Sequence, residues 1–179
     1  RPWFEEHLES KLVDPSGATA FLRAAYALDV GTMRMLVEYG ADPNIRSVRT
    51  PSRSRLDRER GDRGEEIDHS GMSPVPVGGP SNTPLHVAAG AGHANYGSGP
   101  VHRHVPDDWM PAVRYLVEEI GLDVNARDHE GLTPLHGAAG RGDTTMIRYL
   151  VEHGADPTLK SRDGLSTADF ANSLILSVP

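Results

Sequence analysis

The sequence predicts an all-α fold built from stacked pairs of short helices. Two observations support this prediction. Residues 130–157 encode a helix, a tight turn and a second helix, and the same segment returns elsewhere along the 179 residues of the chain. Neither helix is long enough to be stable alone in water, so each pair needs neighbours of its own kind to bury its apolar face.

The first helix of the unit has clear signals at both ends. Thr133 is a good N-cap, and Pro134 follows at the first helical position, where its missing N–H costs nothing. The helix runs on through Leu135, and Gly140 and Gly142 end it.

The second helix is marked by a cap and by an apolar stripe. Asp143 can cap it, as Asp29 can cap the matching helix of an earlier copy of the unit. Ile147, Leu150 and Val151 fall at positions i, i+3 and i+4, which predicts one buried face. Gly154 stands where a residue in the left-handed region is wanted after the helix.

The pattern recurs along the chain. Residues 19–43 match residues 133–157 without a gap, and Gly164 begins a further copy 33 residues after Gly131. A Thr-Pro-Leu-His tetrapeptide occurs twice, as Thr83, Pro84, Leu85 and His86 and as Thr133, Pro134, Leu135 and His136. A period of 33 residues with this signature resembles the ankyrin repeat.

The resemblance implies an ankyrin-repeat solenoid with two long insertions. We expect an N-terminal helical flank or partial repeat over residues 1–16 and an ankyrin repeat domain over residues 17–179. The expected repeats cover about 17–49, 80–128 and 129–161, with a partial repeat over 162–179, and the expected insertions cover about 49–79 and 94–109.

The first insertion is about 31 residues long and has low hydrophobicity. Residues 53–68 are nearly all charged, and a proline-rich stretch over residues 73–80, expected to be semi-extended, follows. This composition predicts a disordered or solvated loop. The arginines of the insertion suggest nucleic acid as a ligand, but acidic residues nearly neutralise them and no aromatic residues interleave, so we expect no nucleic acid.

The second insertion differs because it contains aromatic and histidine side chains. Tyr96 and Trp109 are candidate anchors for a partner, although Trp109 has the alternative of packing over the start of the next helix. His102 and His104, with His93 nearby, suit a metal site only as an alternative, because their spacing in a loop is weakly specific.

Two local features are expected after this insertion. Asp107 or Asp108 is the predicted cap of the next helix, with Pro111 in its first turn. The segment Glu118–Ile120 contains one residue more than the repeat pattern requires.

The composition of the chain excludes several classes of function and of site. The net charge of −7 predicts no general attraction to nucleic acid or to an anionic membrane, and no apolar stretch approaches a transmembrane length. The chain has no cysteine, which excludes disulfides and thiolate metal sites. We find no enzyme signature and expect no cofactor. The resemblance implies that His86 and His136 are structural, bonding locally around the threonine hydroxyl and tying adjacent repeats together.

The resemblance also implies a non-catalytic scaffold that binds a partner protein. The expected binding surface is the concave face, the second insertion or both, and the chain is expected to be monomeric. Partner-facing positions are the tips of the inter-repeat loops and the exposed residues of the first helices: Arg127, His129, Glu130, Arg162, Asp163, Arg23, Val87 and Arg141.

The sequence is compatible both with a cytoplasmic protein and with one exported to the periplasm. The chain begins at Arg1 without Met, so we expect an excised fragment or a mature product. Its long insertions are similar to those of bacterial ankyrin proteins, some of which are exported.

Overall fold

The computed structural model describes residues 17–50, 68–90 and 109–175. The expected flank over residues 1–16 and most of both insertions lie outside this part of the chain. Within it the fold is all-α, as predicted. The described residues form no strand, only isolated antiparallel bridges between Val48 and Pro80 and between Lys160 and Ser166.

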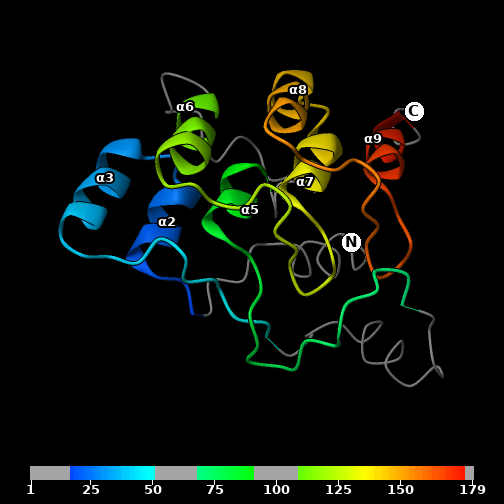
Figure 1. Ribbon diagram of the computed structural model, residues 1–179, viewed down its shortest axis with the longest axis horizontal. Helices are drawn as coiled ribbons and strands as arrows, with labels where there is room; N and C mark the ends of the chain where they lie inside the picture. Colours follow the sequence, from blue (N-terminus) through cyan, green and yellow to red (C-terminus); the bar gives the residue numbers. More distant parts are fainter. Residues whose placement is uncertain (1–16, 51–67, 91–108, 176–179) are drawn as a thin grey trace, which may run out of the picture.

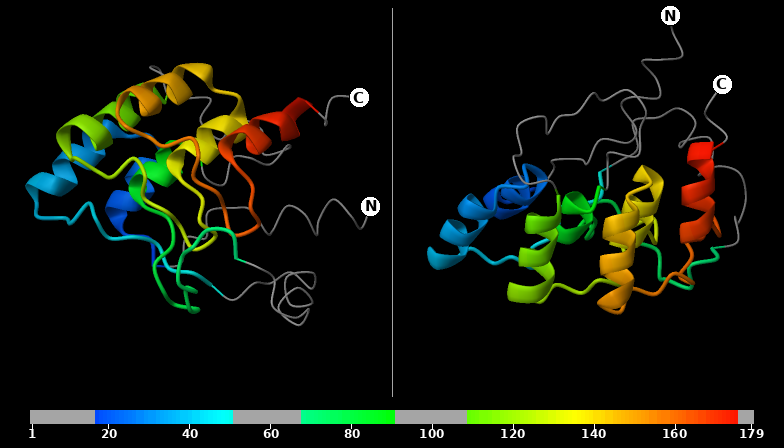
Figure 2. Two further views of the ribbon diagram at one scale, coloured as in Figure 1. Left: turned by 45° about the vertical axis from the view of Figure 1, so that its right-hand side comes forward. Right: turned by 90° about the horizontal axis from the view of Figure 1, so that it is seen from above.

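The helices form two rows (Figures 1 and 2). The first row holds α2 (Ala20–Tyr26), α5 (Pro84–Ala88), α7 (Pro134–Arg141) and α9 (Thr167–Ile175). The second row holds α3 (Val30–Glu38), α6 (Met110–Arg114), which continues into the π-helix η1 (Tyr115–Glu119), and α8 (Thr144–Glu152). Each first-row helix packs against the next one in the order α2, α5, α7, α9, so the solenoid is continuous.

The predicted caps are present at most helix starts. The Asp29 and Asp143 carboxylates accept the N–H groups of Thr32 and Met146 at 2.9 and 3.0 Å. Gly154 has φ 91°, the left-handed conformation expected there. The predicted cap of α6 is wrong, because Trp109 stands at the cap position and its side chain makes no capping bond. Pro111 is in the first turn as predicted.

The core lies between the two rows, and one predicted core residue is misplaced. Leu150 is fully buried, as expected, but the Val151 side chain is 44% exposed. Met146 is buried in its place. The apolar stripe therefore runs through Met146 and Leu150, because residues four apart lie on the same helix face.

The extra residue predicted at Glu118–Ile120 is absorbed by η1. The Ile120 N–H donates to the Tyr115 carbonyl at 3.0 Å, a bond that spans five residues in place of four. A single inserted residue in a helix is commonly accommodated as a π-turn of this kind. Tyr115 and Leu116 consequently still face the core.

The Thr-Pro-Leu-His motif joins one repeat to the next. Nδ1 of His86 lies 3.3 Å from the Thr83 N–H and 2.7 Å from its hydroxyl, while Nε2 lies 3.0 Å from the Leu132 carbonyl. Nε2 must therefore carry the proton, since a carbonyl can only accept. Burial lowers the pKa of His86 to about 4, which keeps the ring neutral.

His136 shares the local part of this arrangement and differs at the other end. Its Nδ1 accepts the Thr133 N–H at 3.1 Å. Among the described residues, its Nε2 makes no hydrogen bond of normal geometry, and the ring packs edge-on against Phe170 of α9 at 5.3 Å between centroids. Burial lowers the pKa of His136, and the backbone of Leu165 and Leu159 in the next repeat opposes this shift. The contact with the next repeat therefore includes ring packing.

The buried stripe of α8 generates a first prediction. Leu150→Ala should lower the free energy of unfolding by about 2–5 kcal/mol, because it removes a fully buried side chain and leaves a cavity. Val151→Ala on the same helix should change it by less than about 1 kcal/mol, since Val151 is 44% exposed and leaves no enclosed cavity. Equilibrium denaturation measures both, and equal losses would contradict the assignment of the face.

The neutral His86 generates a second prediction. Its pKa is about 4 in the fold and about 6.5 in the unfolded chain, so the unfolded chain binds the proton first as the pH falls. The neutral His86 ring therefore contributes fully to the free energy of unfolding well above pH 6.5 and contributes less as the pH falls below it. The free energy of unfolding should drop by about 2 kcal/mol between pH 7 and pH 5 for this reason.

The measurement is denaturation of the wild type and of His86→Gln at both pH values. The Gln variant should lose less free energy over this interval, whatever its starting stability. Burial raises the pKa of Asp128 to about 7, which acts in the opposite direction but equally in both proteins. Equal pH dependence of the two proteins would show that His86 is not held neutral.

Candidate functional site

The loops between successive helix pairs form three neighbouring fingers along one edge of the stack (Figure 1). We define the first finger as residues 42–50 with 78–82, the second as residues 123–132 and the third as residues 156–166. Each is fixed to its neighbour. The Asn125 side chain bridges the second and third fingers, donating to the Gly154 carbonyl just before the third finger and accepting the Asp156 N–H, both at 2.8 Å.

Arginine side chains continue this bracing toward the finger tips. Arg46 of the first finger donates to the Arg127 carbonyl at 2.8 Å. Arg162 of the third finger donates to the His129 carbonyl at 2.7 Å, and Arg127 donates to the Lys160 carbonyl. Because an arginine carries five N–H donors in a rigid fork, it can satisfy main-chain carbonyls that no strand or helix pairs.

The same arginines hold a further segment, residues 68–77, which we call the strap. It crosses the finger tips and leads back to α5 (Figure 1). The His69 N–H donates to the Arg162 carbonyl at 3.1 Å, the bond that an additional finger would make. It repeats the hydrogen bond between the second and third fingers, in which the Arg162 N–H donates to the Glu130 carbonyl at 2.9 Å.

Three finger arginines bind the strap along its length. Arg127 donates to the Ser70 carbonyl and Arg162 to the Ser73 carbonyl, each at 2.8 Å. Arg49 donates to the Val75 carbonyl. Asp68 completes the set through an ion pair with Arg162.

The strap corrects the expectation that the whole first insertion is a disordered or solvated loop. Residues 51–67 lie outside the described part, but residues 68–77 are seated on the fingers, and residues 78–80 belong to the first finger. The hydrophobicity of the sequence does not reveal the contact between the strap and the fingers, because the strap contributes main-chain carbonyl groups that every sequence has.

Two finger glycines allow the strap to approach closely. Gly131 and Gly164 have φ of 79° and 80°, a region that favours glycine. A Cβ atom on Gly131 would lie 3.1 Å from the Ser70 Cβ, and one on Gly164 would lie 3.1 Å from the His69 ring.

The second finger is held by a buried carboxylate. Asp128 accepts the N–H groups of Glu130 and Leu132 at 2.9 Å, and the Leu132 carbonyl is the group that His86 binds. Burial, reinforced by the Glu130 charge, raises the pKa of Asp128 to about 7.

His129 is predicted to face a partner, but its side chain instead contacts a neighbouring finger. Its Nδ1 lies 2.8 Å from the Ser81 hydroxyl of the first finger. Burial lowers its pKa to about 4, assisted by the charges of Arg49 and Arg162. The ring is therefore neutral at pH 7 and part of the contact between fingers, whereas Glu130 beside it is exposed.

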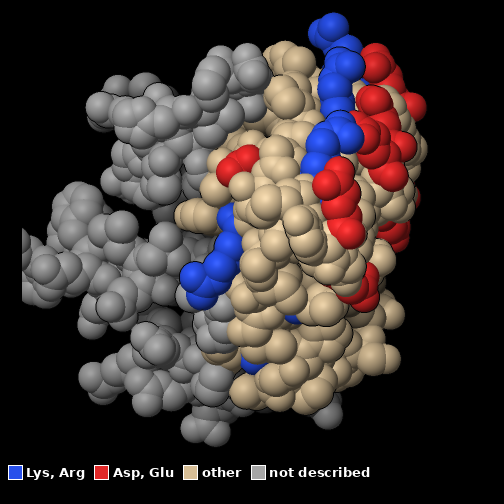
Figure 3. All heavy atoms as spheres, turned by 90° about the vertical axis from the view of Figure 1, so that its left-hand side faces the viewer, with Lys and Arg blue, Asp and Glu red and all other residues tan. Residues whose placement is uncertain are grey.

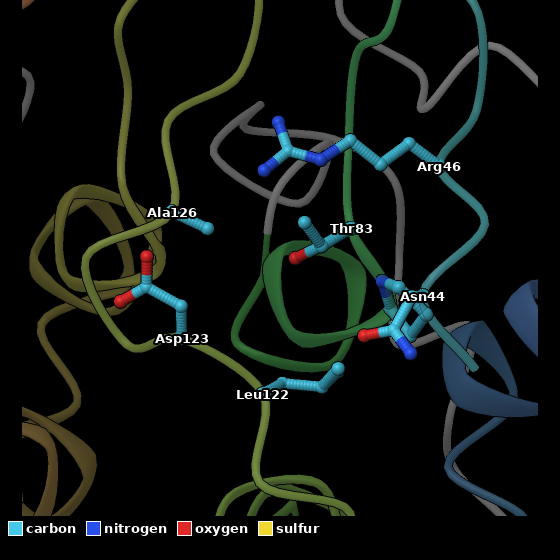
Figure 4. Close-up of a pocket in the computed structure, with 7 residues that line it drawn as sticks. Asn44, Arg46, Thr83, Leu122, Asp123 and Ala126 are labelled. Carbon is cyan, nitrogen blue, oxygen red and sulfur yellow. The ribbon is translucent and has the colours of Figure 1, made fainter.

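A shallow pocket of about 220 Å³ opens between the first and second fingers (Figure 4). Arg46 and Asp123 line opposite sides, with Thr83 and Leu122 between them. The Thr83 hydroxyl is engaged with His86, and the Asp123 carboxylate accepts the Asn125 N–H at 2.8 Å. These groups hold main-chain turns and do not form a catalytic arrangement.

The predicted first-helix positions divide into exposed and covered residues. Arg23 on α2 is exposed, as expected. Val87 is fully buried in α5, so its expected exposure is wrong. Sequence reasoning missed this burial because it depends on what packs over α5 in the folded chain, which the local pattern of the helix does not encode.

Arg141 is largely covered, not exposed. Its guanidinium lies 3.6 Å from the centroid of the Trp109 ring and pairs with Asp143 at 2.7 Å. A Cβ on Gly90 would lie only 2.7 Å from the Arg141 side chain, so Arg141 crosses from α7 over the preceding helix pair. Trp109 therefore packs at the start of α6, one of its two expected positions.

The remaining candidates lie outside the described residues. Tyr96 and the alternative metal ligands His93, His102 and His104 fall within residues 91–108. In the described ranges, no group of three or more His, Asp or Glu side chains could hold a metal ion, and no helix is long and apolar enough to span a membrane.

The end of the stack formed by α2 and α3 has a mixed surface (Figure 3). Basic and acidic side chains lie beside each other along one edge of this face, and much of the rest is uncharged. At this end of the stack Arg34 of α3 forms an ion pair with Glu119 of η1, and Met35 and Tyr39 are exposed at 48% and 85%.

A family model described as ankyrin repeats (3 copies) matches residues 67–161. Among curated proteins, the chain is similar to alpha-latrocrustotoxin-Lt1a of Latrodectus tredecimguttatus, with 27% identity over 90% of this chain and 8% of that protein. A protein of Fowlpox virus named as an ankyrin repeat protein is 45% identical over 40% of this chain and 10% of its own length. A Treponema pallidum protein named as ankyrin repeat-containing is 42% identical over 33% of this chain and 20% of its own.

The chain thus spans a fifth or less of each of these relatives. They come from a spider, a virus and a bacterium, so they do not single out the bacterial origin suggested by the insertions. Ankyrin repeats generally mediate protein–protein interaction and are typically non-catalytic. The repeated helix pairs, the motif histidines and the match over residues 67–161 lead to one conclusion: the chain belongs to the ankyrin repeat family.

Proposed function

We propose that this chain is a non-catalytic scaffold that binds a partner protein through the concave face of the stack, the insertion over residues 94–109, or both. The observation that carries this proposal is the braced row of fingers and first-row helices. Side chains on a surface that is already fixed lose little conformational freedom when a partner binds.

The distribution of exposed residues supports the same proposal. Arg23 faces solvent on α2, and Glu130 is exposed at the tip of the second finger. Trp109, stacked against Arg141 at the start of α6, is a fixed aromatic side chain beside this insertion in the sequence. Aromatic and arginine side chains are the types that most often carry interface energy.

Affinity capture with the intact chain tests this function. A variant lacking residues 95–108 or carrying Arg23→Glu should bind the captured partner at least about 10-fold more weakly. Arg148→Glu is the matched control, because Arg148 is exposed on α8 in the opposite row, and it should leave the dissociation constant within about 2-fold. Identical binding by all variants, or no partner at all, would contradict the proposal.

A second measurement concerns the histidines of the insertion. We expect elemental analysis of the purified chain to find no stoichiometric zinc, and added Zn²⁺ or chelator to leave the melting temperature unchanged. Stoichiometric zinc that disappears in the His102→Ala/His104→Ala double variant would instead favour a metal-binding domain.

A further inference from the structure

The strap is bound mainly through groups that any extended peptide possesses. Arg127, Arg162 and Arg49 contact the carbonyls of Ser70, Ser73 and Val75. Prolines at positions 74 and 76 favour the extended backbone that lets successive carbonyls reach successive fingers.

Side-chain burial contributes little to the seating of the strap. Asp68, His69, Ser73 and Val77 are exposed, Val77 by 58%, and although Ser70, Met72 and Val75 are half-buried, no residue of the strap is fully buried. The one side chain of the strap that forms an ion pair with the fingers is Asp68, which contacts Arg162. A contact made of main-chain carbonyls and one carboxylate is not specific to this segment.

The three arginines come from three different fingers, so they form a row across the stack. The chain carries a net charge of −7, yet this row presents positive charge at the tips. A row of guanidinium groups at consecutive fingers matches an extended main chain with an acidic residue, because each arginine can bind carbonyls or a carboxylate with two donors.

We propose that the row formed by Arg49, Arg127 and Arg162 is a binding surface for an extended, carboxylate-bearing segment of a partner protein, and that the strap occupies this surface as an internal competitor. The inference rests on the proposed scaffold function and names the chemistry of one of its ligands. The strap shows both how such a segment is held and why the surface is closed in the isolated chain.

Tethering sets the strength of this competition. The strap is joined to the stack at both ends, so its effective concentration at the fingers is on the order of millimolar. A free segment with the same contacts is therefore excluded at micromolar concentration. It binds once the strap is weakened, or when a partner adds contacts elsewhere on the stack.

Gly71→Val weakens the strap without touching the fingers. Gly71 has φ 69° and no atom within 4 Å of an added Cβ, so valine there strains the strap backbone and meets no neighbour. Gly40→Val is the matched control, because Gly40 has φ 87°, is equally unobstructed, and lies after α3 away from the strap.

The probe is a fluorescently labelled peptide with the sequence of residues 68–77, titrated into the full chain and followed by anisotropy. The Gly71→Val protein should bind it at least about 10-fold more tightly than either the wild type or Gly40→Val. Adding Arg162→Gln to Gly71→Val should reverse the gain, and so should replacing the aspartate of the peptide by asparagine.

Hydrogen exchange at the His69 amide reports whether the strap has left the fingers. A second variant, Gly71→Val/Asp68→Lys, releases it further by also removing the ion pair. Release of the strap without tighter peptide binding would overturn the proposal. So would a strap that stays protected in both variants, since it would then be a fixed part of the fold. Either result leaves the capture test of the scaffold function unaffected, because that test concerns Arg23 and residues 95–108.

Discussion

Contact between neighbouring repeats is the constraint on which this structure depends. No α-helix in the described part exceeds nine residues, and α5 has only five. Such helices are not stable alone in water, so their stability comes from the interior that they share. The His86 ring shows how closely the repeats are joined, since one nitrogen binds its own helix start and the other binds the Leu132 carbonyl of the next finger.

The same constraint applies to the fingers. Their main-chain groups lie outside helices and strands, and the buried ones must find partners within their own finger or on the adjacent one. Arginine side chains supply many of these partners, as Arg46 does for Arg127 and Arg162 does for His129. At the third finger the described chain provides the strap, whose His69 N–H satisfies the Arg162 carbonyl. The strap thus extends the row of fingers and covers its tips at the same time.

Local signals in the sequence were sufficient for most of the fold. Helix caps such as Asp29 and Asp143, and the glycine after α8, depend on a few consecutive residues, and they were predicted correctly. The burial of Val87 and the exposure of Val151 were not, because each depends on which side of a helix meets a neighbour. The strap was missed for a further reason: its contacts are long-range and use main-chain carbonyls, which leave no mark in composition or periodicity.

Disulfide trapping tests the seating of the strap most directly, since the chain has no cysteine of its own. A Cβ on Gly164 would lie 3.5 Å from the Cβ of His69, within the separation of about 3.5–4.5 Å that a disulfide spans. The His69→Cys/Gly164→Cys protein should therefore form an intramolecular disulfide readily under mild oxidation. The control pair His69→Cys/Gly121→Cys should not, because nothing lies within 4 Å of a Cβ on Gly121. Equal cross-linking of the two pairs, which carry the same backbone strain at a glycine of positive φ, would show that the strap does not lie on the third finger.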